Sequence, residues 1–187
     1  MRAKGQRAED WHPSREVILA WSILGVVLSL AGIISFAATY AFARGEDGGT
    51  VEISLLALVV PTLVVFVLLG VHEWVHGLTM ACFGARPQYG AGLFGHVMPY
   101  VYCTSPGHGF TRTQFAAISA APLAIISSVG AVCVAFVPLG GWLVIPLGVH
   151  LGGCIGDIWL LGIIARLPRN TVLEDLATGV RIVRPLV

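Results

Sequence analysis

The sequence predicts an all-α polytopic membrane protein, with four transmembrane helices and a small cytoplasmic β-hairpin-like loop between the second and the third. Of its 187 residues, 56% are hydrophobic and only 11% are charged, whereas an ordinary soluble domain carries roughly 25% charged residues. The apolar residues are also gathered into blocks longer than about 18 residues, which is the length typical of a membrane-spanning helix. This composition excludes an ordinary soluble domain.

Four apolar blocks are expected to span the membrane, at about residues 17–42, 53–83, 115–137 and 142–165. The first block follows a basic N-terminus, as a signal peptide would, but its apolar stretch exceeds the roughly 7 to 15 residues of a signal sequence. We therefore expect it to be retained as a span. The expected organisation is a cytoplasmic N-terminal segment (1–16), one membrane domain (17–166) and a cytoplasmic C-terminal tail (167–187).

The positions of the basic residues predict the orientation of the spans. Lysine and arginine are concentrated before the first block, around the connection between the second and third, and after the fourth. In the connection between the first two blocks, Arg44 is the only basic residue, and several acidic residues follow it. Because cytoplasmic loops are enriched in basic residues, we expect a multi-pass protein of the cytoplasmic membrane with both termini inside. The net charge of +1 gives no reason to expect a nucleic-acid partner.

The connection at residues 84–113 is the longest, and loops beyond about 15 residues are usually functional or disordered. Its segment 97–103 is rich in β-branched and aromatic residues and lies between glycine-rich turns. This pattern predicts a short strand or hairpin. A second small hairpin is expected in the tail at residues 171–187, without a catalytic role.

The four cysteines are expected to be free thiols. Cys82, Cys103, Cys133 and Cys154 show no CxxC spacing, and the predicted topology places the first two near the reducing cytoplasm. A disulfide framework is therefore not expected.

The second apolar block contains His72-Glu73-Trp74-Val75-His76. Two histidines four residues apart project from the same face of a helix, so that their imidazoles can bind one metal ion. Zinc is bound by neutral imidazole and lowers the pKa of its bound water, and Glu73 can accept the proton that this water releases. Charged groups cost roughly 2.5 to 3.5 kcal/mol at the centre of a membrane helix, so their clustering here indicates a Zn²⁺ site with His72 and His76 as ligands.

Catalytic zinc normally has three protein ligands, and Asp157 is the acidic residue inside another span. His76 lies ten residues before Arg86, and Asp157 lies nine before Arg166, which places both about 14 to 15 Å from the cytoplasmic boundary. Asp157 is therefore the expected third ligand. The first alternative is His150, which lies seven residues before Asp157 and therefore on nearly the same helix face. The others are Cys154, His96 and His108.

These residues resemble the site-2-protease type of intramembrane metalloprotease and, more closely, a bacterial and archaeal family of small four-span zincin peptidases. The residues that carry the likeness are His72 to Gly77, Phe83-Gly84, Ala120-Ala121-Pro122, His150-Leu151 and Gly156-Asp157. The resemblance implies that His72, His76 and Asp157 bind zinc and that Glu73 activates water. The aspartate usually stands in an Asp-Gly setting in the site-2 proteases, whereas Ile158 follows it here.

The expected function is that of a zinc-dependent intramembrane metalloprotease, in which Glu73 activates a zinc-bound water to hydrolyse peptide bonds of membrane-embedded or membrane-proximal substrates. Its expected partners are the lipid bilayer and a membrane protein or peptide substrate. The substrate must be held extended, and the strand at 97–103 could pair with it. The alternative is a non-proteolytic membrane metal-binding or transport protein that uses the same histidine and aspartate residues.

Overall fold

The computed structural model describes residues 6–45, 54–94, 98–177 and 179–185. The chain forms two compact units. The first consists of Met1–Ile18, Glu73–Ala121 and Asp157–Val187, and the second of Leu19–His72 and Pro122–Gly156. Each unit is described by itself below.

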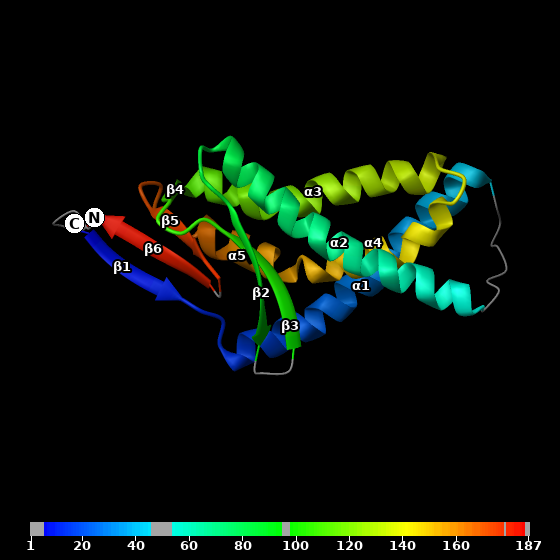
Figure 1. Ribbon diagram of the computed structural model, residues 1–187, viewed down its shortest axis with the longest axis horizontal. Helices are drawn as coiled ribbons and strands as arrows, with labels where there is room; N and C mark the ends of the chain where they lie inside the picture. Colours follow the sequence, from blue (N-terminus) through cyan, green and yellow to red (C-terminus); the bar gives the residue numbers. More distant parts are fainter. Residues whose placement is uncertain (1–5, 46–53, 95–97, 178, 186–187) are drawn as a thin grey trace. The chain divides into compact units, whose positions relative to one another are not determined.

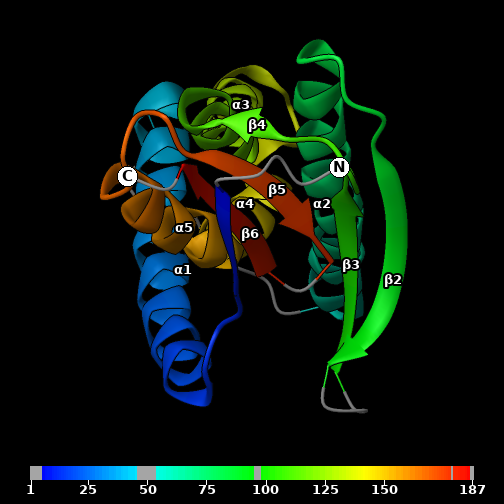
Figure 2. The same ribbon diagram turned by 90° about the vertical axis from the view of Figure 1, so that its left-hand side faces the viewer.

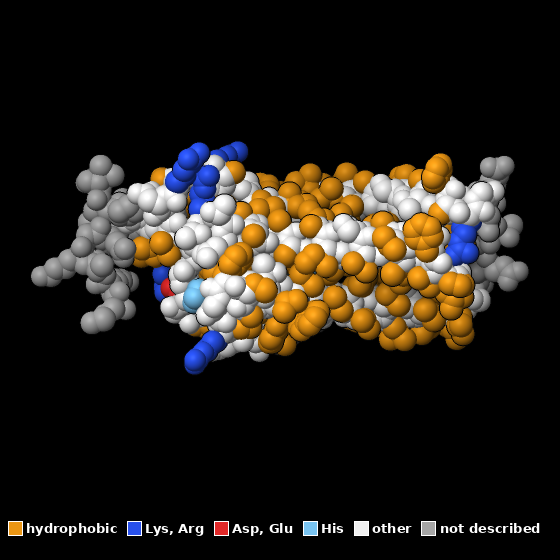
Figure 3. All heavy atoms as spheres, turned by 90° about the horizontal axis from the view of Figure 1, so that it is seen from above, with side chains coloured by type: hydrophobic (Ala, Val, Ile, Leu, Met, Phe, Trp, Pro, Cys, Tyr) orange, Lys and Arg blue, Asp and Glu red, His pale blue; other side chains and the backbone are white. Residues whose placement is uncertain are grey.

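The protein is mostly helical, and four helical stretches are long and apolar enough to cross a membrane. They are α1 (Arg15–Arg44), α2 (Leu55–Cys82), α3 (Arg112–Phe136) and the stretch Gly140–Ala165 (Figure 1). With 25 to 30 residues each, they measure about 37 to 45 Å at 1.5 Å per residue, more than the roughly 30 Å of a hydrocarbon core. Hydrophobic side chains cover much of their exposed surface in Figure 3. The prediction of four such helices is confirmed.

The fourth stretch is not one continuous helix. It consists of a short 3₁₀ helix η1 (Gly140–Leu143), then α4 (Val144–Gly153) and α5 (Ile155–Ala165). Cys154 separates α4 from α5, and its backbone N–H still donates to the carbonyl of His150 at 3.1 Å. The apolar pattern of this stretch gave no sign of the interruption, which puts Asp157 in the first turn of α5. A helix N-terminus favours a negative charge at that position.

The first unit contains a four-stranded antiparallel sheet in the order β1-β6-β5-β4. Its strands are β1 (Gln6–Trp11), β4 (Phe110–Thr111), β5 (Val172–Leu176) and β6 (Gly179–Pro185). The hairpin predicted in the tail is confirmed as β5–β6. Strand β1 was not predicted, because its polar sequence lacks an apolar alternation. It pairs with β6, and Arg181 forms an ion pair with Asp10 at 2.7 Å across the two strands.

The hairpin predicted between the second and third long helices is also confirmed. Strands β2 (Gln88–Phe94) and β3 (Met98–Thr104) pair antiparallel with Tyr89 opposite Cys103 (Figures 1 and 2). Residue 97, the start of the predicted strand, lies outside the described residues. On β2, a Cβ atom at Gly90 would lie 2.5 Å from the ring of Tyr102. The glycine therefore lets this aromatic ring lie across the neighbouring strand.

A hydrophobic core holds the first unit together. The rings of Phe110 and Phe115 are fully buried in it, with their centroids 6.0 Å apart. The core joins α2, α3 and α5 to the sheet and to the hairpin, and so fixes the elements that carry the candidate site. Its buried members are Met80, Ala85, Cys103, Phe110, Phe115, Ile118, Ile164, Leu167, Leu173, Val180 and Ile182.

In the second unit, glycines bring the backbones of α1 and α4 close together. A Cβ atom at Gly32 would lie 2.9 Å from the Cα atom of Gly148, and one at Gly152 would lie 2.3 Å from the carbonyl oxygen of Gly25. Small residues at such crossings are typical of helices that pack within membranes. This close packing fixes α4, the helix that carries His150.

Candidate metal centre

The motif His72 to His76 lies within α2, which is helical without interruption from Leu55 to Cys82. Its two histidines therefore lie one turn apart on the same helix face. The helix ends at Cys82, and Gly84, two residues later, has a positive φ of 82°, which is typical of a glycine just beyond the C-terminus of a helix. The division between the two units falls between His72 and Glu73.

In the first unit, His76 is held from both sides of its ring. Its Nδ1 lies 3.0 Å from the carbonyl oxygen of Ile118, and its Nε2 lies 3.4 Å from Oδ1 of Asp157. A carbonyl only accepts hydrogen bonds, so the proton of a neutral His76 is on Nδ1 and Nε2 carries the lone pair. This is the arrangement of a histidine that binds metal through Nε2.

The sequence explains why the carbonyl of Ile118 can accept this bond. In an α-helix that carbonyl would accept from the N–H of the residue four positions later, which is Pro122. Proline has no N–H to donate. The Ile118 oxygen can therefore accept a hydrogen bond from Nδ1 of His76 instead. The proline inside the third apolar block was therefore a signal for this part of the site.

The spacing of His76 and Asp157 fits a shared zinc ion. Two ligands with zinc distances of about 2.0 to 2.1 Å in a tetrahedral site lie about 3.3 Å apart, and the observed separation is 3.4 Å. Both side chains are largely shielded, with exposed fractions of 12% and 16%. Imidazole and carboxylate together form a donor set that zinc accepts.

In the second unit, His72 lies beside His150 and Cys154. Its Nδ1 is 3.2 Å from Nε2 of His150 and 3.9 Å from Sγ of Cys154. The ligand atoms of these three residues lie within 4.8 Å of one another, so this group could also hold a metal ion. The two histidines four residues apart thus have different neighbours, and the alternatives for the third ligand stay open.

The remaining two alternatives do not join either arrangement within the part of the chain that the structure describes. His108 packs against the ring of Phe110, with the centroids 4.6 Å apart. His96 lies outside the described residues.

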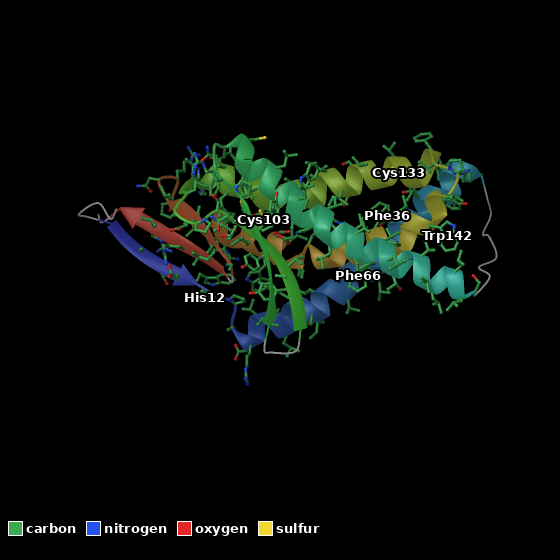
Figure 4. The ribbon with its side chains drawn as sticks, viewed as in Figure 1. His12, Phe36, Phe66, Cys103, Cys133 and Trp142 are labelled. Atoms are coloured by element: carbon green, nitrogen blue, oxygen red, sulfur yellow. The ribbon has the colours of Figure 1, made fainter. Side chains whose placement is uncertain are left out.

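In the first unit, the charge of Glu73 acts on residues of the β2–β3 hairpin and of β5. Burial raises the pKa of the Cys103 thiol to about 12, and the charge of Glu73 adds to this effect. Cys103, seen on β3 in Figure 4, is therefore a neutral thiol at pH 7. Burial likewise raises the pKa of Tyr89, which is hydrogen-bonded to Cys103. Glu73 is thus within electrostatic reach of these two neutral side chains.

The hairpin touches α2 at the glycine that follows the motif. A Cβ atom at Gly77 would lie 2.1 Å from the hydroxyl oxygen of Tyr89 and 3.0 Å from Sγ of Cys103. A larger residue at this position would displace the hairpin. Gly77 therefore brings β2 and β3 to the turn of α2 that carries His76.

Asp175 on β5 is a nearby acidic residue that sequence reasoning missed. Burial raises the pKa of its carboxyl to about 7, with the charges of Glu73 and Asp157 adding to the shift and that of His76 opposing it. The tail was expected to have no catalytic role. One signal could have found this residue, because alternation along the strand puts Asp175 on the same face as the fully buried Leu173.

A histidine and a carboxylate at zinc-ligand spacing, with a glutamate three residues before that histidine, are features of a metal-dependent hydrolase. A family model for putative zincin peptidases matches residues 65–172. Because the match covers more than half of the chain, the protein belongs to this family. The matched stretch includes the motif and Asp157, and it ends before Asp175. No curated protein and no solved structure matched the chain.

Proposed function

We propose that the protein is a zinc-dependent intramembrane metalloprotease that hydrolyses peptide bonds of membrane-embedded or membrane-proximal substrates. The observation that carries this proposal is the geometry of His76, whose Nδ1 is engaged by Ile118 while its Nε2 lies 3.4 Å from Asp157. This histidine belongs to a helix apolar enough to cross a membrane. Membership of the zincin peptidase family supports a metallopeptidase.

In the proposed site, His72, His76 and Asp157 hold the metal, with both histidines using Nε2. The carbonyl of Ile118 orients His76, and His150 orients His72 through its Nδ1. Such partners commonly fix the tautomer and the direction of metal-binding histidines. When bound, zinc supplies Lewis-acid chemistry, because it lowers the pKa of water and polarises a carbonyl group.

Glu73 is the proposed general base and acid. It accepts a proton from the attacking water and delivers it to the amine that leaves. Its neighbours Cys103 and Tyr89 both have raised pKa values, so neither competes for that proton as an anion near pH 7.

We also propose that the protein is a multi-pass protein of the cytoplasmic membrane with both termini in the cytoplasm. The four apolar helices support insertion, and the distribution of basic residues supports the orientation. The pairing of β1 with β6 brings the two terminal strands side by side, as termini on one side of a membrane require.

Cleavage by the purified protein tests this proposal. In detergent, the wild type is expected to cut model transmembrane peptides, to lose at least about 90% of this activity with a zinc chelator, and to regain it when zinc is added back. Cleavage that continues unchanged in the chelator would contradict a metal-dependent mechanism.

The hairpin is the proposed holder of an extended substrate, because a strand edge can pair with a peptide through backbone hydrogen bonds. We expect Tyr100→Pro and Val101→Pro on β3 to lower kcat/KM at least about tenfold while zinc content is retained, since proline removes an N–H and disturbs the strand. Val101→Thr is the matched control, because it keeps a β-branched residue. Full cleavage by both proline variants would exclude this role of the hairpin.

A second candidate function is metal binding or transport without proteolysis. The group of His72, His150 and Cys154 favours it, because these residues could hold an ion without Glu73. The two functions differ in what Glu73 does, and its replacement separates them.

A further inference from the structure

The first unit contains a cavity of about 250 Å³ outside the metal centre. Residues of the β2–β3 hairpin form one part of its wall, and the end of β5 with the following residues forms another. The cavity is lined by Gln88, Tyr89, Tyr102, Thr104, Pro106, Asp175, Leu176 and Ala177. All of these belong to the same unit.

Asp175 is the one charged residue among those that line the cavity. Its neighbour Glu174 is differently placed, because it pairs with Arg181 at 3.2 Å and accepts a bond from the N–H of Gly107 at 2.7 Å. Within the described part of the chain, no lysine or arginine lies within 4.0 Å of the Asp175 carboxylate. Buried carboxylates are costly unless a cation or hydrogen bonds compensate them. Burial raises the pKa of the Asp175 carboxyl to about 7, so it is partly neutral at pH 7, and a cation bound in the cavity would favour its charged form.

The rest of the lining also suits a cation. Tyr89 and Tyr102 supply aromatic rings, whose faces attract ammonium and guanidinium groups. Gln88 and Thr104 supply side-chain oxygens that can accept hydrogen bonds. Among the charged groups that act on Asp175, His76 lowers the pKa of its carboxyl, and Glu73 and Asp157 raise it.

The cavity lies close to the proposed reaction centre within this unit. Tyr89 lines it and also contacts Gly77, the residue after His76. Asp175 lines it and is within electrostatic reach of Glu73. A substrate whose scissile bond is near Glu73 could therefore place a nearby side chain in the cavity.

We propose that this cavity is a subsite for a basic side chain, lysine or arginine, of the substrate, and that Asp175 is the residue that determines this specificity. The inference rests on the proposed protease function for its biological meaning. The cationic group is held between the Asp175 carboxylate and the tyrosine rings, and the substrate class is a membrane peptide with a basic residue close to the cleavage position.

Peptide binding tests the subsite without requiring hydrolysis. The probes are fluorescent, N-acetylated and C-amidated transmembrane peptides with no other basic residue, in which a single lysine is moved stepwise along one flank. Matched peptides carry norleucine, a neutral side chain of similar length, at the same positions. Acetylation removes the terminal ammonium group, and a non-acetylated norleucine peptide shows whether a terminal amine binds instead.

In the Glu73→Gln background, which prevents cleavage during the measurement, we expect at least one lysine position to bind about 10- to 100-fold more tightly than its norleucine match. Asp175→Asn is expected to bring this ratio close to one. Asp10→Asn is the matched control, because it removes an aspartate on β1 that pairs with Arg181, and it is expected to keep the ratio.

Three results would overturn the subsite. They are equal binding of lysine and norleucine peptides at every position, a lysine preference that survives Asp175→Asn, and a preference only for the terminal amine. Cleavage by the wild type without a lysine preference would leave the protease function standing and refute the subsite. A lysine preference lost in Asp175→Asn, with no cleavage by the wild type, would support the subsite and refute the protease function.

Discussion

Replacement of Glu73 by glutamine is expected to abolish proteolysis while the metal stays bound. Glutamine has nearly the same size as glutamate, but its amide cannot accept the proton from water. General acid–base catalysis contributes typically 10² to 10⁴-fold, so we expect kcat/KM on a model transmembrane peptide to fall at least about 10³-fold. Zinc per chain is expected to equal that of the wild type, since Glu73 is not a proposed ligand.

Glu9→Gln is the control for this variant, because it makes the same chemical change on β1, away from the motif. It is expected to leave cleavage unchanged. A Glu73→Gln protein that keeps more than a tenth of the wild-type rate would rule out Glu73 as the base. Metal binding by both forms without proteolysis by either would instead support the metal-binding or transport alternative.

Replacement of a metal ligand is expected to have the second large effect. His76→Ala and Asp157→Ala are each expected to reduce bound zinc from about one per chain to below about 0.1, and to abolish cleavage. The reason is the spacing of 3.4 Å between the His76 and Asp157 ligand atoms, which allows both to bind one ion. Loss of one of three protein ligands removes much of the binding free energy.

His150→Ala is the comparison that separates the two possible ligand sets. As a residue that orients His72, it is expected to weaken zinc binding by about 10- to 100-fold, so that the variant still fills with zinc when the metal is in excess. The opposite result, zinc retained by Asp157→Ala and lost by His150→Ala, would assign the metal to His72, His150 and Cys154. Elemental analysis of both variants, equilibrated at the same free zinc concentration, measures the difference.

The sequence predicts the long helices well because apolar length is a strong signal. It also predicts the motif on α2, since histidines four residues apart share a helix face. Other elements depend on distant partners. Strand β1 forms by pairing with β6, about 170 residues later, and no local pattern shows this. The helix break at Cys154 is likewise not visible in the apolar pattern of its segment.

The surroundings of the motif could be predicted only in part. Asp157 was expected as the third ligand, and the structure brings it to His76, while its role as a ligand remains a prediction. Pro122 leaves the carbonyl of Ile118 without its usual helical donor, but the sequence does not show that His76 is the group that reaches it. Asp175 was missed, because its approach to Glu73 depends on how the C-terminal strands pack within the unit.

The central claim is that this chain holds a catalytic metal ion, and the metal content of the purified wild-type protein tests it most directly. The measurement is zinc per chain, by elemental analysis of protein in detergent after equilibration with a small excess of zinc and removal of the unbound metal. We expect about one zinc ion per chain. A folded wild-type protein that retains no metal would contradict the account.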